Sequence, residues 1–192
     1  MTYFKHKDKG FTLVEMIISV GIFTIMSAII LANYPEFRSR SALDNLAAQI
    51  ATVYREAQIY GISVREEGEA NFSIGYGVHI DRTVSDTDLI IFSDADKDFI
   101  FNEKFDSILE TFKLGGGERL TKLCIPSCVS AKIQNEVDSL TAVFVRPNPD
   151  ASFSVRDTLD PSASSISIEV SNRSGSYLRN VEVFTTGQIS VR

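Results

Sequence analysis

The sequence predicts an α+β protein in which a long N-terminal transmembrane and amphipathic helix packs on an antiparallel β-sheet or a two-sheet globular domain. Residues 11–32 form an apolar run whose only charge is Glu15, and apolar residues recur at helical spacing over 43–57. From residue 70 onward, short apolar runs alternate with turn residues, as in β structure. The expected domains are a basic leader (1–10), a transmembrane half-helix (11–34), an amphipathic half-helix (35–61) and a β-rich globular domain (62–192).

The apolar run has the length of a single membrane span, for which about 20 apolar residues suffice. Lys5, Lys7 and Lys9 precede it. Basic residues beside a first span tend to stay in the cytoplasm. We therefore expect a single-pass protein whose N-terminus lies in the cytoplasm.

Glu15 is unusual because a carboxylate inside a bilayer costs about 2.5–3.5 kcal/mol on insertion scales. One interpretation places Glu15 at the membrane interface, where its carboxylate reaches the headgroups. The other gives it a cationic partner. Cleavage after Gly10 would give Phe11 a free α-amino group, which could pair with Glu15 of the same or a neighbouring subunit.

The stretch Lys9-Gly10-Phe11-Thr12-Leu13-Val14-Glu15 closely resembles the class III prepilin signal of type IV pilins and type II secretion pseudopilins. In that family, a prepilin peptidase cuts after the glycine and methylates the new N-terminal phenylalanine. The resemblance implies cleavage between Gly10 and Phe11, N-methylation of Phe11, and an assembly role for Glu15.

The same resemblance implies that the protein lies in the inner (cytoplasmic) membrane, with its soluble domain periplasmic or extracellular in a pilus or pseudopilus. Its expected partners are other pilin or pseudopilin subunits, prepilin peptidase, the inner-membrane assembly platform and membrane lipid. An unprocessed, membrane-anchored binding protein is the main alternative. A conventional secretory signal fits less well, because its apolar core is usually shorter and residues 31–35 make a poor cleavage site.

Beyond the span, Pro35 is expected to kink or interrupt the helix, and Gly61 to end it. The helix should therefore extend from Phe11 to about Tyr60. Its second half carries a stripe of apolar residues on one face, formed by Leu43, Leu46, Ile50, Val53 and Ala57. This stripe needs a partner surface, and the β-rich remainder is the only candidate.

Alternation and short apolar runs predict eight strands, with Gly115-Gly116-Gly117 as a turn. The expected strands are 71–80, 89–92, 108–114, 140–146, 151–155, 166–170, 181–185 and 189–191. This helix-plus-β arrangement also looks like the pilin family. Residues 140–150 and 181–191 resemble the minor pseudopilins of the H type and their pilus counterparts.

Cys124 and Cys128 are the only cysteines. Such a close pair is expected to form a disulfide in an oxidising exterior, with free thiols as the alternative. A zinc site would need further ligands, and no other cysteine or histidine lies nearby in the sequence.

Asp94, Asp96 and Asp98 alternate as at the start of a calcium loop, where hard oxygens converge on a hard cation. Counting from Asp94, the sixth position is Phe99 rather than glycine and the twelfth is Phe105 rather than an acid, although Glu103 and Asp106 are near. Ca²⁺ is thus the one cofactor that the sequence suggests. A metal-free acidic turn is the alternative.

The net charge of −6 disfavours nucleic acid as a partner, and loss of residues 1–10 would make the chain more acidic still. A DNA-binding minor pilin for DNA uptake is an alternative that requires clustering of the C-terminal arginines. These are Arg146, Arg156, Arg173, Arg179 and Arg192. The sequence has no G-x-S-x-G or H-E-x-x-H motif, and His79 fits a structural role on a strand. We therefore expect a structural subunit and not an enzyme.

Overall fold

The computed structural model describes residues 10–63, 74–128, 136–156 and 158–192. It contains one long helix, α1 (Leu13–Ile62), followed by eleven strands. The chain divides into two compact units, residues 1–39 and 40–192, and each is described by itself. The fold class predicted from the sequence, a long apolar helix followed by a two-sheet antiparallel β domain, is confirmed.

The first unit holds the N-terminal part of α1, and none of its described side chains is buried. Among the described residues, α1 is the one helix long and apolar enough to cross a membrane, with a mean hydropathy of 2.3 in its most apolar window. Of the two effects expected of Pro35, a kink or an interruption, the interruption is excluded, because α1 continues through this residue. Proline removes one backbone N–H donor, and a helix of 50 residues retains most of its other hydrogen bonds.

In the second unit, residues 40–62 of α1 bury the predicted apolar stripe. Leu43, Ile50 and Ala57 are fully buried within the single hydrophobic core. Gly61 does not end the helix, which reaches Ile62. A β-carbon at Gly61 would lie 2.6 Å from the carbonyl oxygen of Phe144, so this glycine permits close contact between the helix and a strand.

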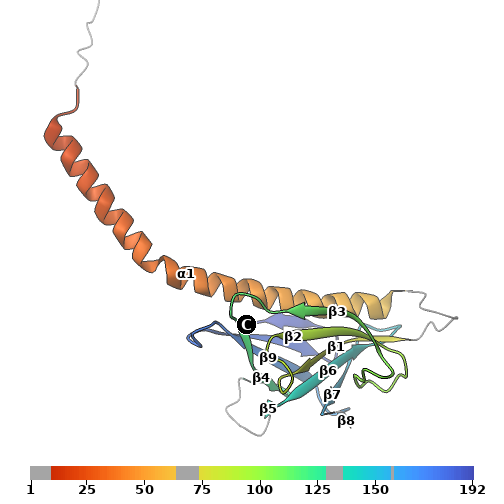
Figure 1. Ribbon diagram of the computed structural model, residues 1–192. Coiled ribbons are helices and arrows are strands. Elements are labelled where there is room, and N and C mark those ends of the chain that lie inside the picture. The colour runs from red at the N-terminus through yellow and green to blue at the C-terminus, as the bar shows by residue number, and fades with distance from the viewer. Residues whose placement is uncertain (1–9, 64–73, 129–135, 157) are drawn as a thin grey trace, which may run out of the picture. The chain divides into compact units, whose positions relative to one another are not determined.

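The strands form two antiparallel sheets (Figure 1). The six-stranded sheet has the order β3-β2-β1-β6-β7-β8, and the five-stranded sheet has the order β11-β10-β9-β4-β5. The strand bounds are β1 Gly75–Asp81, β2 Asp88–Asp94, β3 Ser107–Lys113, β4 Arg119–Cys124, β5 Glu136–Val137, β6 Ser139–Phe144, β7 Ala151–Val155, β8 Thr158–Leu159, β9 Ser165–Ser171, β10 Leu178–Phe184 and β11 Ile189–Val191.

Each sheet contributes its inward-facing residues to one core with the helix. Val78, Ile80 and Phe144 come from the six-stranded sheet, and Ile168 and Val181 from the five-stranded sheet. All five are fully buried. The core therefore explains why the second half of α1 is amphipathic, because only one face of it packs on the sheets.

Polar contacts also join the helix to the five-stranded sheet and to one turn of each sheet. The Gln58 amide donates hydrogen bonds to the carbonyl oxygens of Pro149 and Gly187, both at 3.0 Å. The Arg179 guanidinium pairs with Asp44 on α1. These contacts fix the position of residues 40–62 along the β domain.

Strand β4 was not predicted from the sequence. Its pairing with β9 shifts register between Leu120 and Lys122, so that Leu120 and Leu123 both face the core although they are three residues apart. A bulge of this kind removes the period-two alternation by which strands are recognised. The first residues of the predicted strand 71–80 lie outside the described residues, and β1 begins at Gly75.

Candidate functional site

The Gly10–Phe11 bond lies before the first helical residue, Leu13. Phe11 is 84% exposed. The first helical backbone hydrogen bond runs from the Met16 N–H to the Thr12 carbonyl, at 3.2 Å. The predicted cleavage site is therefore free of helical hydrogen bonds, as a peptidase requires of the backbone that it binds.

Thr12 caps the N-terminus of α1. Its Oγ1 accepts a hydrogen bond from the Glu15 N–H at 3.2 Å. A threonine cap followed three residues later by glutamate is the capping-box pattern, in which both side chains can satisfy unpaired N–H groups. Sequence reasoning missed this role of Thr12, although the T-x-x-E spacing was visible.

Glu15 lies in the first turn of α1 and is the only carboxylate between residues 10 and 35. The partial positive charge of the helix N-terminus favours a carboxylate there. The side chains around it are apolar and exposed, including Met16 and Ile18. In a bilayer, Glu15 would thus be the one charged group on an otherwise apolar surface.

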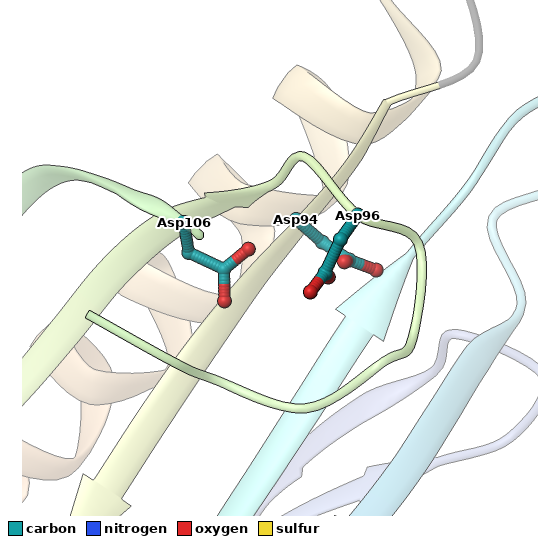
Figure 2. Close-up of side chains that lie close together, drawn as sticks. All are labelled: Asp94, Asp96 and Asp106. Atoms are coloured by element: carbon teal, nitrogen blue, oxygen red, sulfur yellow. The ribbon is translucent and has the colours of Figure 1, made fainter. Parts of the chain in front are cut away.

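A second feature is the acidic loop, residues 95–106, which links β2 to β3. One oxygen from each of Asp94, Asp96 and Asp106 lies within 4.8 Å of the others (Figure 2). Asp94 and Asp106 are buried and Asp96 is exposed. Three converging carboxylate oxygens are the kind of ligands that bind a hard divalent cation.

The two buried carboxylates already accept backbone hydrogen bonds. Asp94 accepts from the N–H groups of Lys97 (2.8 Å) and Phe99 (3.2 Å), both of which have positive φ values of 65°. Asp106 accepts from Ala95 at 3.1 Å and Asn102 at 2.7 Å. These bonds hold the loop in its conformation, so the cluster has a structural role whether or not it binds metal.

Burial is the main reason that the pKa of Asp94 rises to about 6, and the nearby Asp106 carboxylate adds to this increase. Burial also raises the pKa of Asp106, with a further contribution from Asp96 and Asp98. Crowded carboxylates that favour their protonated form would bind a cation once they are ionised.

The predicted metal set was Asp94, Asp96 and Asp98. The structure brings Asp94 and Asp96 together with Asp106 instead. The Asp98 side chain accepts a hydrogen bond from the Ile100 N–H at 2.8 Å. Asp106 was noted as a nearby acid but not included in the predicted set, because it follows the Asp94–Asp98 run by eight residues and only the folding of the loop brings it back.

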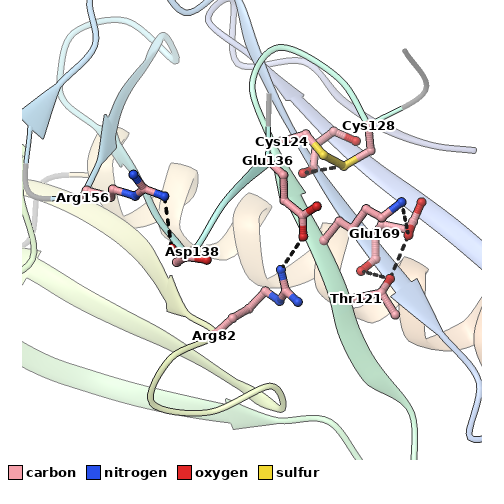
Figure 3. Close-up of polar contacts among 10 residues, drawn as sticks. Arg82, Thr121, Cys124, Cys128, Glu136, Asp138, Arg156 and Glu169 are labelled. Atoms are coloured by element: carbon pink, nitrogen blue, oxygen red, sulfur yellow. Dashed lines mark hydrogen bonds and ion pairs between the residues drawn. A yellow bond between two sulfur atoms is a disulfide. The ribbon is translucent and has the colours of Figure 1, made fainter. Parts of the chain in front are cut away.

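Cys124 and Cys128 form a disulfide with a Cα–Cα distance of 5.2 Å (Figure 3). Nearby, residues 136–138 carry the chain from the five-stranded to the six-stranded sheet. Arg82 pairs with Glu136 at 2.9 Å and Arg156 with Asp138 at 3.1 Å, one at each end of this short connection. These ion pairs therefore contribute to holding the two sheets together.

Three of the five C-terminal arginines are held by carboxylates of the same chain. Arg156 pairs with Asp138, Arg179 with Asp44, and Arg192 with Glu182. These pairs reduce the positive charge available for DNA phosphate. His79 is buried, and its Nδ1 lies 2.8 Å from Thr141 Oγ1, which fits the structural role predicted for it.

Comparison with known proteins bears on the N-terminal segment. Residues 5–31 match the family model described as the prokaryotic N-terminal methylation motif. The chain carries a prepilin-type N-terminus. This motif supports membership of the pilin and pseudopilin family, which is structural and non-enzymatic, and it supports membrane anchoring through α1. No curated protein and no solved structure matches the chain.

Proposed function

We propose that this protein is a minor pilin or pseudopilin, a structural subunit of a type IV pilus or type II secretion pseudopilus. Prepilin peptidase would cut it after Gly10 and methylate Phe11. The observation that carries this proposal is the methylation motif over residues 5–31, which leads directly into an apolar helix with an exposed surface.

The mechanism of assembly follows from the first turn of α1. Removal of residues 1–10 places the α-amino group of Phe11 close to Glu15 in sequence, and neighbouring subunits bring further copies of both groups. An unpaired carboxylate in hydrocarbon is costly, whereas a carboxylate paired with an ammonium group is not. The pair therefore selects one axial offset between neighbouring helices as a subunit leaves the bilayer.

Substitutions at Glu15 and Thr12 separate assembly from helix capping. Glu15→Gln removes the charge but retains a side chain that can complete a capping box, whereas Thr12→Val removes the cap and retains the charge. We expect Glu15→Gln and Glu15→Leu to insert into the membrane normally and to enter filaments at least about tenfold less well than the wild type. Thr12→Val should enter filaments nearly normally.

The measurement is the ratio of protein in sheared filaments to protein in membranes, in cells that express the native assembly machine. Glu15→Asp, which keeps the charge, serves as the matched control and should retain more filament entry than Glu15→Gln. Wild-type incorporation of Glu15→Gln would disprove the charge mechanism. Normal filament entry of Glu15→Gln, together with an equal loss in Thr12→Val and Glu15→Leu, would assign the role of Glu15 to capping alone.

Within the family, we place this protein nearest the minor pseudopilins of the H type, on the likeness of residues 140–150 and 181–191. The proposed Glu15 contact is common to pili and pseudopili, so the assignment to one machine rests on these two segments. The DNA-binding alternative predicts that the full chain is retained on immobilised DNA and released by salt. The unprocessed-anchor alternative predicts that residues 1–10 stay attached.

A further inference from the structure

The negative charge of the chain is concentrated in the segment around the β1–β2 turn and the acidic loop. Residues 81–106 contain eight carboxylates and three basic side chains, so they carry nearly all of the net charge of −6. This segment belongs to the six-stranded sheet and plays no part in the contacts proposed for the membrane helix.

Part of this charge lines a hollow of about 710 Å³, which we call the acidic hollow. Its carboxylates are Asp81, Asp88, Asp98 and Glu103, and Phe101 and other apolar side chains lie among them. Lys113 pairs with Asp88 at 3.2 Å, and Lys104 also lines the hollow. The Glu103 side chain is exposed and makes no hydrogen bond or ion pair within the described part of the chain.

A second hollow, of about 600 Å³, is lined by residues of the β1–β2 turn and of β4, and we call it the arginine hollow. Arg82 and Arg119 line it, with Asp86 as the one carboxylate. The Nε atom of Arg82 is buried without a hydrogen-bond partner. The Nη1 atom of the same side chain pairs with Glu136 at 2.9 Å. The exposed Arg119 side chain, by contrast, has no ion pair or hydrogen bond among the residues that the structure describes.

Val84, at the tip of the β1–β2 turn, borders both hollows. It is 83% exposed, the highest value for a large apolar side chain among the described residues of the second unit. The turn is anchored, because the Asp86 carbonyl accepts a hydrogen bond from the Leu120 N–H at 2.8 Å. An exposed apolar side chain between an acidic and a basic hollow forms a surface that is complementary in charge to a second copy of itself.

We propose that the β1–β2 turn is a contact surface between two copies of this chain, in which the acidic hollow of one copy receives the arginine hollow of the other. Glu103 and Arg119 are the side chains whose charges are free to pair across this contact. Val84 provides the apolar centre, where contacts contribute most to affinity, and the charges around it fix the orientation. The contact goes beyond the proposed assembly through α1, and its failure would leave that proposal unchanged.

Charge reversal tests this contact. The full chain is purified in a density-matched detergent, and its dissociation constant is measured by sedimentation equilibrium for the wild type, for Glu103→Arg and for Arg119→Glu. We expect each variant to self-associate about tenfold more weakly, because like charges then face each other. An equimolar mixture of the two variants should regain an affinity near that of the wild type, because opposite charges face each other again in both halves of the contact.

Two exposed side chains outside both hollows provide controls of matched charge change. Asp150→Arg and Arg55→Glu should associate as strongly as the wild type. Any association through α1 is common to all variants, so it does not change the comparison. A wild type that stays monomeric would overturn the proposal, and a different subunit would then be the expected partner of this surface. The proposal would also be overturned by a mixture that associates as weakly as its components, or by controls that weaken equally.

Discussion

At the scale of single residues, Thr12, Glu15 and the carboxylates at the ends of the acidic loop have the clearest roles. Glu15 was evident from the sequence because it is the only charge in a long apolar run, and the resemblance to prepilins gave it a role. The capping role of Thr12 was not identified, and Asp106 was noted only as a nearby acid and not as a member of the cluster. Their roles depend on where the helix begins and on how the loop folds back, which residue spacing alone does not specify.

The raised pKa of Asp94 determines the sign of its contribution to the pH dependence of the free energy of unfolding. Its folded-state pKa of about 6 lies above the ordinary value of 3.8, so between these pH values the folded protein holds a proton that the unfolded chain releases. The contribution of Asp94 to the free energy of unfolding is therefore present at low pH and is lost as pH rises from about 4 to about 6. Asp81 and Asp88, whose pKa values are lowered, act in the opposite direction.

Ca²⁺ binding at the three-aspartate cluster stays a prediction, and the pH dependence provides its test. At pH 7 we expect 1 mM Ca²⁺ to stabilise the protein by about 1.4 kcal/mol if the dissociation constant is about 0.1 mM. The effect should vanish near pH 4.5, where Asp94 is protonated.

The measurement is thermal unfolding with Ca²⁺ and with Mg²⁺ at equal ionic strength, using Asp96→Asn as a variant that leaves the loop hydrogen bonds in place. No Ca²⁺ effect at pH 7, or an equal effect in Asp96→Asn, would show that the cluster is an acidic turn without a metal.

At the scale of elements, the helix and most strands could be predicted because their residues alternate with the period of the element. The apolar stripe of 43–57 and the ends of β7 and β11 agree with the structure. The failures have local physical causes. Strand β4 contains a bulge that breaks its alternation, and Pro35 does not interrupt α1, which loses only one backbone donor there. The end of α1 at Ile62 lies close to the expected end at about Tyr60.

Gly61 illustrates how packing overrides local preference. Alanine has a higher helix propensity than glycine by about 1 kcal/mol, so propensity alone predicts that Gly61→Ala is stabilising. A β-carbon there would meet the Phe144 backbone, and overpacking of this kind costs about 1–3 kcal/mol. We expect Gly61→Ala to lower the unfolding temperature, as measured by near-ultraviolet circular dichroism of the full chain.

The matched control for this prediction is Thr52→Ala, at an exposed position of the same helix. It should be neutral or stabilising, because it also brings a gain in helix propensity, smaller than that of Gly→Ala, without a new contact, and it removes only the exposed hydrogen bond from the Thr52 hydroxyl to the Ala48 carbonyl. An increase in unfolding temperature for Gly61→Ala would mean that the helix and β6 do not approach as closely as the structure has them.

At the scale of the whole molecule, the two units differ in the hydrophobicity and charge of their surfaces, and these differences suit them to different roles. The first unit exposes apolar side chains that suit a bilayer or the interior of a filament, and the second unit buries its apolar residues in one core. Its polar surface, with charge concentrated around the β1–β2 turn and the acidic loop, is then available for contacts outside the membrane. The sequence alone predicted the long apolar helix, but the two hollows required the folded arrangement of distant segments.

The measurement that tests the central claim most directly is the intact mass and N-terminal residue of the protein purified from its native membrane. We expect a chain that begins at Phe11 and carries one added methyl group. A chain that still begins at Met1, in cells where prepilin peptidase is active, would contradict the proposed processing and identify the helix as a plain membrane anchor.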